Sequence, residues 1–292
     1  MAQQKIGKYT ILKNLEQGGM ARIYLARCRS VKQPVVLKKL TLTNRKEFKQ
    51  RFEREAHLMH MFKNPFIVKV LDFFKSGASF YMAMEFVDGM SLDKLIRLKE
   101  VLSPTATALI AFQVCEALEY AHAKGVIHRD IKPANILIGK NGKVKLTDFG
   151  IATTDDTGSG ERLTKTGTCF GTSCYMSPEQ IESSKHVDER SDVYSLGVTL
   201  YEMMTGARPF KANFSSETIT NIYNGKYVKP EKLNPAIPAK FRTIIKKAMC
   251  NIKESRYANI GKLKAALAPF LKKFKDAKSK HTFIKRYLAE RT

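Results

Sequence analysis

The chain contains the run His128-Arg129-Asp130-Ile131-Lys132-Pro133-Ala134-Asn135, and Asp148-Phe149-Gly150 follows it. Carboxylate and amide oxygens are the ligands that Mg²⁺ prefers, and an Asp beside them can take a proton from a hydroxyl group. The two segments in register are a far more specific signal than a lone Asp-Phe-Gly. Together they predict two metal ligands and a base beside one another. The alternative is a chance polar loop between two hydrophobic runs.

The composition sets wider limits. Hydrophobic residues make up 43% of the 292 residues, which is ordinary for a globular protein with a sizeable core. A formal net charge of +24 suits nucleotides, nucleic acid, acidic proteins or anionic lipid, and does not choose among them. The five cysteines are scattered, and no stretch has the length of a signal peptide core or a membrane-spanning helix. We therefore expect a cytoplasmic protein without disulfides or a transmembrane segment.

Hydrophobic patterning divides the chain into a strand-rich and a helical part. Strands are predicted at 9–12, 23–26, 35–38, 68–74 and 79–86, with an amphipathic helix at 45–62. Ser103 and Pro104 provide an N-cap and a first helical residue, and an apolar helix runs from there to about Lys124. Further helices are expected at 190–205 and 238–250. The prediction is an α+β protein whose first 85 or so residues are rich in β-strand.

These residues resemble the protein kinase superfamily, and most closely the eukaryotic-like Ser/Thr kinases of bacteria, over roughly residues 8–268. The resemblance implies a two-lobe protein kinase fold, with an N-lobe at about 8–86, a C-lobe at about 88–268 and a basic extension at 269–292. It also implies an enzyme that uses ATP and Mg²⁺ to phosphorylate Ser/Thr hydroxyls of proteins, including its own activation segment.

The resemblance gives each residue of the opening run a role. Asp130 is expected to be the base, or to orient the substrate hydroxyl. Lys132 is typical of Ser/Thr-specific members and neutralises charge on the transferring phosphoryl group. Asn135 and Asp148 are expected to hold Mg²⁺.

Three further expectations concern the support of this loop. Asp192 resembles the buried helix Asp that fixes the loop backbone by hydrogen bonds. Glu179, in Ser177-Pro178-Glu179, is expected to pair with Arg256. His128 and Phe149 are expected to serve packing rather than chemistry.

The ATP-binding residues are expected mainly in the strand-rich part. Lys38 matches the strand Lys that contacts the phosphates, and its expected partner is Glu55, with Glu53 as the competitor. Met84 is the expected gatekeeper, and the main chain of Glu85 and Val87 is expected to bond the adenine. The remaining ATP-binding predictions are Gly18, Gly19, Ile23 and Leu137.

The glycine-rich loop departs from the family pattern. Glu16 and Ala21 replace its first and third glycines, and Val36 stands where the family usually has Ala above the adenine. Glu16 and Val36 motivate one alternative, a pseudokinase or scaffold that binds partners with little catalysis. The charge of +24 motivates another, a nucleic-acid-binding module.

The activation segment carries hydroxyl groups in a Gly/Ser/Thr-rich stretch. We predict autophosphorylation at Thr164 or Thr166, because Arg129 needs an anion to order it. The alternative is a polar loop that is never modified. Thr172 matches the Ser/Thr-kinase pattern and is expected to bond Asp130 and Lys132 as part of the substrate pocket.

The C-terminal residues 262–292 hold ten Lys/Arg against two acids. Apolar residues return at helical spacing up to Phe274, and Pro269 is expected to interrupt that helix. Beyond Phe274, further apolar residues lie among Lys and Arg. This tail could dock on the kinase domain, an acidic protein, nucleic acid or an anionic membrane surface.

Overall fold

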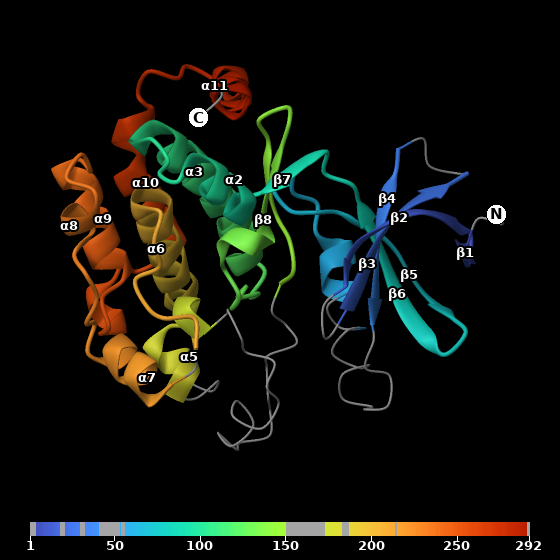
Figure 1. Ribbon diagram of the computed structural model, residues 1–292, viewed down its shortest axis with the longest axis horizontal. Helices are drawn as coiled ribbons and strands as arrows, with labels where there is room; N and C mark the ends of the chain where they lie inside the picture. Colours follow the sequence, from blue (N-terminus) through green and yellow to red (C-terminus); the bar gives the residue numbers. More distant parts are fainter. Residues whose placement is uncertain are drawn as a thin grey trace. The chain divides into compact units, whose positions relative to one another are not determined.

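The computed structural model describes residues 4–17, 21–29, 33–40, 53, 56–149, 173–182, 187–213 and 215–290. It separates into two compact units, Met1–Asp88 and Gly89–Thr292 (Figure 1). In the part of the chain covered by these ranges, no helix combines the length and the apolar character needed to cross a membrane.

The first unit is built on a six-stranded antiparallel sheet with the strand order β1-β2-β3-β4-β6-β5. The strands are β1 (Lys5–Ile6), β2 (Tyr9–Gln17), β3 (Ala21–Cys28), β4 (Val35–Leu40), β5 (Val70–Ser76) and β6 (Ser79–Glu85). The predicted strands all lie within or overlap these elements, and residues 56–61 are helical. In β4, Val35 and Leu37 point into a buried cluster with Tyr24, Ala26 and Tyr81. Because strand side chains alternate, Lys38 belongs to the opposite face.

The second unit is mainly helical. Its helices are α2 (Leu92–Lys99), α3 (Pro104–His122), α5 (Pro178–Glu182), α6 (Arg190–Thr205), α7 (Ser216–Tyr223), α8 (Pro230–Leu233), α9 (Ala239–Ala248), α10 (Ile260–Leu267) and α11 (Ala277–Ala289). A small antiparallel sheet is formed by β7 (Gly89–Ser91), β8 (Ile136–Gly139) and β9 (Val144–Leu146). The short helix η1 (Pro133–Asn135) leads into β8.

Local chemistry explains where the long helices begin and end. Ser103 Oγ accepts the Ala106 N–H at 3.2 Å, so it caps α3 as predicted. Helix α6 ends at Thr205 and is capped by Gly206, whose φ of 71° is the left-handed conformation that favours glycine. Most residues of α3 and α6 are buried. Helix α6 contacts α3, α9 and α10, and α3 also contacts α10. Helix α6 is therefore a rigid base for the side chains that it presents.

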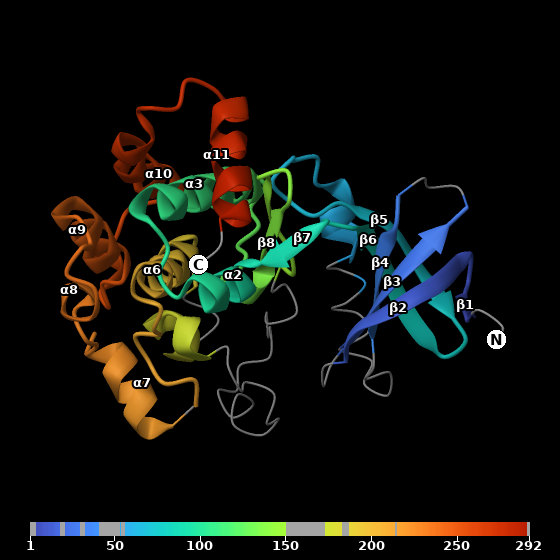
Figure 2. The same cartoon turned by 45° about the horizontal axis from the view of Figure 1, so that its top comes forward.

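The C-terminal residues add one more helix to this unit. Helix α10 ends at Leu267, and Pro269 lies in the short helix η6 (Ala268–Leu271), which agrees with the predicted interruption. Helix α11 then begins with a capping box, in which Asp276 Oδ1 accepts the Ser279 N–H at 2.7 Å. It contacts α3, and Figures 1 and 2 both show it beside the β8–β9 hairpin.

Candidate active site

The backbone of the loop that begins at His128 is fixed by one buried carboxylate. Asp192 on α6 is fully buried, and its Oδ2 and Oδ1 accept the N–H groups of His128 and Arg129, each at 2.8 Å. His122 Nε2 lies 2.7 Å from Asp192 Oδ2. Several partners are what a buried carboxylate requires. The predicted role of Asp192 is thus confirmed.

Two residues of the site have a left-handed backbone. Arg129 has φ 65° and Asp148 has φ 54°, although neither is glycine. Such conformations cost on the order of 1–3 kcal/mol each and persist where the surroundings fix them. For Arg129 the fixing contacts are Asp192 at its N–H and Gln180, whose Nε2 donates to the Arg129 carbonyl at 2.8 Å.

Asp130 receives two donors on one of its two carboxylate oxygens. Lys132 Nζ lies 2.9 Å from Asp130 Oδ2, and Asn135 Nδ2 donates to the same oxygen at 2.9 Å and to the Asp130 carbonyl at 2.8 Å. Asp130 Oδ1 is buried without a hydrogen-bond partner among the described residues. The carboxylate is therefore held at one oxygen, and its second oxygen keeps an unused hydrogen-bond acceptor among the described residues.

The β8–β9 hairpin brings Asn135 and Asp148 to the same end of two paired strands. Ile136 pairs with Leu146, and the Thr147 N–H donates to the Asn135 carbonyl at 3.0 Å. Asn135 and Asp148 directly flank these positions. Since the amide nitrogen of Asn135 faces Asp130, its amide oxygen points elsewhere. An amide oxygen and a carboxylate at one hairpin end are hard donors that fit Mg²⁺.

His128 is a packing residue in a defined tautomer. It is fully buried, Nε2 lies 3.0 Å from the Thr147 carbonyl, and the Asp130 N–H donates to Nδ1 at 3.2 Å. Nε2 therefore carries the proton. Its ring lies 4.4 Å from that of Phe149, centre to centre. Burial lowers the pKa of His128. Both residues thus have the predicted packing role.

Glu179 and Arg256 form the predicted ion pair below this loop. Arg256 donates to both carboxylate oxygens, at 2.7 and 2.8 Å, and Ser191 Oγ donates to Glu179 at 2.6 Å. Burial alone would raise the pKa of Glu179, but the hydrogen bonds and charge of Arg256 outweigh it, so the pKa lies below its ordinary value. The pair joins α5 to the segment after α9.

The first unit positions the predicted ATP-binding residues that the structure describes. Strand register places Lys38 between Ile23 on β3 and Met82 on β6. The Glu85 N–H donates to the Lys69 carbonyl at 2.9 Å, so a contact of Glu85 with adenine would use its carbonyl. Val87 is half-buried after β6. In the second unit, Leu137 is half-buried on β8 and pairs with Ser91 and Lys145.

Several predicted residues lie outside the described part of the chain. They are Gly18, Gly19, Glu55, Thr164, Thr166 and Thr172. Their roles stay predictions.

Sequence reasoning missed two supporting side chains, His122 and Gln180. His122 could have been noticed as a polar residue in an apolar helix. No pattern in the sequence pointed to Gln180.

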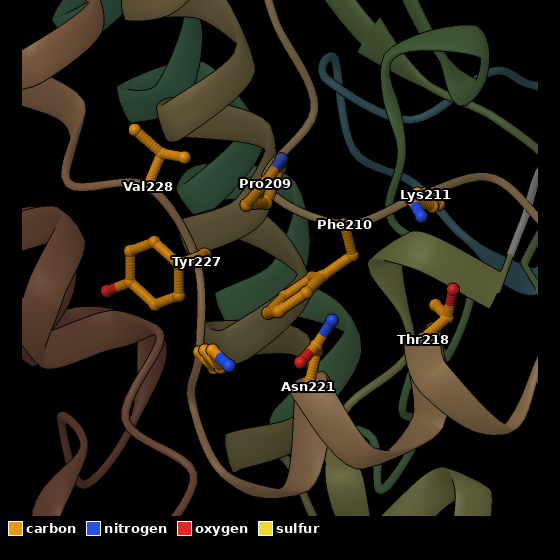
Figure 3. A pocket seen from close by; sticks show the side chains of 8 residues that line it. Pro209, Phe210, Lys211, Thr218, Asn221, Tyr227 and Val228 are labelled. Carbon is orange, nitrogen blue, oxygen red and sulfur yellow. The ribbon is translucent and has the colours of Figure 1, made fainter.

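A hollow of about 360 Å³ lies elsewhere in the second unit. In Figure 3 the ring of Phe210 lies between Tyr227 and Asn221, and Thr218 and Val228 also line the space. None of the predicted site residues lines it. It is thus separate from the residues expected to bind ATP or metal.

Comparison with known proteins identifies the family. Residues 9–268 match the family described as "Protein kinase domain". The chain is 37% identical over 252 residues to a probable serine/threonine-protein kinase, CPE1738, of Clostridium perfringens, covering 86% of this chain and 36% of that protein. It is 35% identical over 264 residues to the serine/threonine-protein kinase PknH of Mycobacterium bovis, covering 89% and 43%. The chain thus spans less than half the length of these relatives.

Solved structures share the fold. The PknI kinase domain of Mycobacterium tuberculosis matches with a TM-score of 0.70 at 24% identity, covering 92% of this chain and all of that one. Rad53 residues 1–466, in complex with AMP-PNP, match with a TM-score of 0.73 at 25% identity, covering 90% and 65%. The predicted α+β fold, with a β-rich and a helical lobe, is confirmed, and so is the resemblance to bacterial Ser/Thr kinases. The chain belongs to the protein kinase family.

Proposed function

We propose that this chain transfers the γ-phosphoryl group of Mg·ATP to Ser/Thr hydroxyls of proteins. The observation that carries the proposal is the arrangement around Asp130. Lys132 and Asn135 hold one carboxylate oxygen, and the other is buried without a partner among the described residues. A carboxylate oriented in this way can accept the proton of an incoming hydroxyl group.

The neighbouring residues have complementary roles. Lys132, next to Asp130, neutralises charge on the phosphoryl group as it moves. Asn135 and Asp148 hold Mg²⁺ through oxygen atoms, and the metal neutralises the charge of the phosphates. In the first unit, Lys38 contacts the phosphates and Glu55 holds it in place, while the backbone of Glu85 and Val87 binds the adenine. Gly18, Gly19, Ile23 and Leu137 complete the nucleotide site.

The pseudokinase alternative rests on Glu16 and Val36 alone. All the groups that phosphoryl transfer needs are present in the sequence: Lys38, Asp130, Asn135 and Asp148. The two departures concern how ATP is held, so they predict a higher KM for ATP rather than an inactive protein.

We also propose regulation by autophosphorylation. Arg129 adjoins Asp130, and its backbone is fixed by Asp192 and Gln180. A phosphate on Thr164 or Thr166 would supply the anion that its guanidinium pairs with, and Thr172 would complete the substrate pocket. Mass spectrometry after incubation with Mg·ATP tests this proposal. Added phosphate is expected between residues 150 and 172, and its absence there would rule the regulation out.

Cys115 and Cys250 carry thiols that form no disulfide among the described residues. Free thiols suit a reducing compartment, which supports the cytoplasm as the place where the chain works.

Labelled ATP tests the main proposal. Asp130→Asn keeps the size of the side chain and removes the base, so we expect incorporation into a protein acceptor to fall by about 10²–10⁴-fold. Nucleotide binding should be retained. Equal incorporation by wild type and variant would contradict the mechanism. No incorporation by either, with nucleotide still bound, would favour the scaffold.

A further inference from the structure

Helix α11 lies beyond the region that matches the family, and its apolar side packs on the rest of the second unit. Ile284 is buried, and the ring of Phe283 lies 5.4 Å from that of Phe274. The Ser103 N–H donates to the Tyr287 hydroxyl at 3.1 Å. The sequence left four partners open for the tail. The structure shows that the tail docks on one of them, the kinase domain. The apolar side of α11 therefore faces the second unit, with Ile284 buried and Phe283, Tyr287 and Leu288 half-buried.

The turn of the β8–β9 hairpin touches α11 closely. A Cβ added at Gly142 would lie 2.0 Å from the His281 carbonyl oxygen. Lys143 on the turn and Lys280 on the helix both act on His281, whose pKa is lowered by burial first and by these two ammonium groups next. Lys280 also lies 4.4 Å from the centre of the Phe112 ring. Positive groups from two distant parts of the sequence therefore gather at this contact.

Further cations extend the charge around the contact. Exposed basic side chains are found on the hairpin turn, on the segment before α11 and on the outer side of α11: Lys140, Lys143, Lys272, Lys273, Lys275, Lys278, Lys285 and Arg286. Figures 1 and 2 show these three segments along one edge of the second unit. No ion pair joins Lys278, Lys285 or Arg286 to an acid anywhere in the described residues. The nearby Asp276 caps α11, and its negative charge also acts on Lys278.

We propose that this edge, formed by the turn 140–143, the segment 272–276 and α11, docks on a lipid surface rich in anionic headgroups. Clusters of four to eight Lys/Arg on a helix have this property, and each adds attraction near the surface. A flat surface can meet all three segments at once, whereas a short acidic peptide covers only some of them. The docking is electrostatic, because the apolar side of α11 faces inward.

The same observations count against nucleic acid as the partner. Single strands are held by bases stacked on aromatic rings. Here the rings of Phe274, Phe283 and Tyr287 contact one another, and the Tyr287 hydroxyl accepts the Ser103 N–H. Seven of the eight exposed cations are Lys, a hydrated point charge, rather than Arg, whose planar fork reads phosphates and bases. Docking does not depend on phosphotransfer, so this proposal and the kinase proposal can fail separately.

Vesicle co-sedimentation of the full chain tests the proposal. Vesicles of phosphatidylcholine with about a third phosphatidylserine should bind the chain at about 0.1 M salt, and pure phosphatidylcholine should not. Binding should disappear at about 1 M salt, where charges are screened within about 3 Å. Equal binding to both vesicles, or binding that salt does not weaken, would overturn the proposal.

A matched pair of variants locates the surface. K278Q/K285Q/R286Q removes three exposed cations that form no ion pair among the described residues. Each should weaken vesicle binding about fivefold, or about 100-fold together. K232Q/K240Q/K246Q removes the same charge from α8 and α9 and should bind like wild type. An equal loss of vesicle binding in the two variants would show that the lipid-binding surface does not lie on α11. Tighter binding to duplex DNA or to an acidic peptide than to the anionic vesicles would overturn the choice of partner. Circular dichroism checks that both variants are folded.

Discussion

Asp192 accepts the backbone N–H of Arg129 at 2.8 Å and so fixes a residue whose φ of 65° is left-handed. The acceptor lies on α6, a helix buried almost all round, and the residue it fixes immediately precedes Asp130. The position of the proposed base is therefore set by the hydrophobic core of the second unit. An exposed loop alone would not hold it there.

Asp192→Ala should damage both stability and catalysis. It leaves the buried N–H groups of His128 and Arg129 without an acceptor, which costs roughly 1–3 kcal/mol for each group. Urea unfolding should show a loss of about 2–6 kcal/mol, and kcat should fall much more than the affinity for ATP. Asp192→Asn keeps one acceptor oxygen, so its stability and its kcat should lie between those of wild type and Asp192→Ala. A variant with unchanged kcat would show that the loop is fixed by other contacts.

Glu179→Gln should alter how stability depends on acid pH. The pKa of Glu179 lies below its ordinary value of about 4.3, so its ion pair stabilises the fold above that pH and loses this effect as pH falls through the lowered pKa. At neutral pH the variant should be less stable than wild type by about 3–5 kcal/mol. The difference should shrink below pH 4 or so. Denaturant unfolding over this pH range measures it, and a constant difference would contradict the assignment.

His128 should destabilise the fold in a different pH window. Its pKa is lowered by burial, so below about pH 6.5 the unfolded chain takes up a proton that the folded chain does not. Stability should fall by about 1 kcal/mol per pH unit as pH drops from 6.5 towards 5. His128→Gln removes the titrating group and should flatten this slope. A slope that persists in the variant would assign the effect to another histidine.

Gly142→Ala should separate α11 from the hairpin. Gly142 has φ 81°, and a Cβ there would meet the His281 carbonyl, so backbone strain and a clash add to roughly 2–5 kcal/mol. Gly125→Ala is the control, because Gly125 has φ 71° with nothing within 4 Å of an added Cβ, and should cost about 1–2 kcal/mol. Urea unfolding compares the two, and hydrogen exchange follows α11. Equal effects would show that the contact is unimportant.

The sequence predicted the parts of the site that follow fixed patterns. The opening run could be placed because its spacing is specific to a known chemistry. Asp192 and the pairing of Glu179 with Arg256 followed from the resemblance to the kinase family. The strands and the cap at Ser103 followed from local propensity. These features depend on residues close in sequence, or on pairs that the resemblance to the kinase family implies.

The rest depended on contacts that no local pattern encodes. Nothing in the sequence links Gly142 to His281, because the contact arises only when α11 folds back over α3. The orientation of the Asn135 amide towards Asp130 is likewise a matter of three-dimensional geometry. The tail is an example. Its apolar residues are visible in the sequence, but the sequence does not show which of four kinds of partner they contact.

The packing around Pro269 has a practical consequence for recombinant work. The family match ends at residue 268, yet just beyond it the Phe270 ring lies 4.8 Å from that of Phe241, a fully buried residue of α9, and Leu271 is buried too. A protein cut at residue 268 would present this apolar surface to water and should aggregate on purification. Expression of the second unit should therefore extend at least to residue 290.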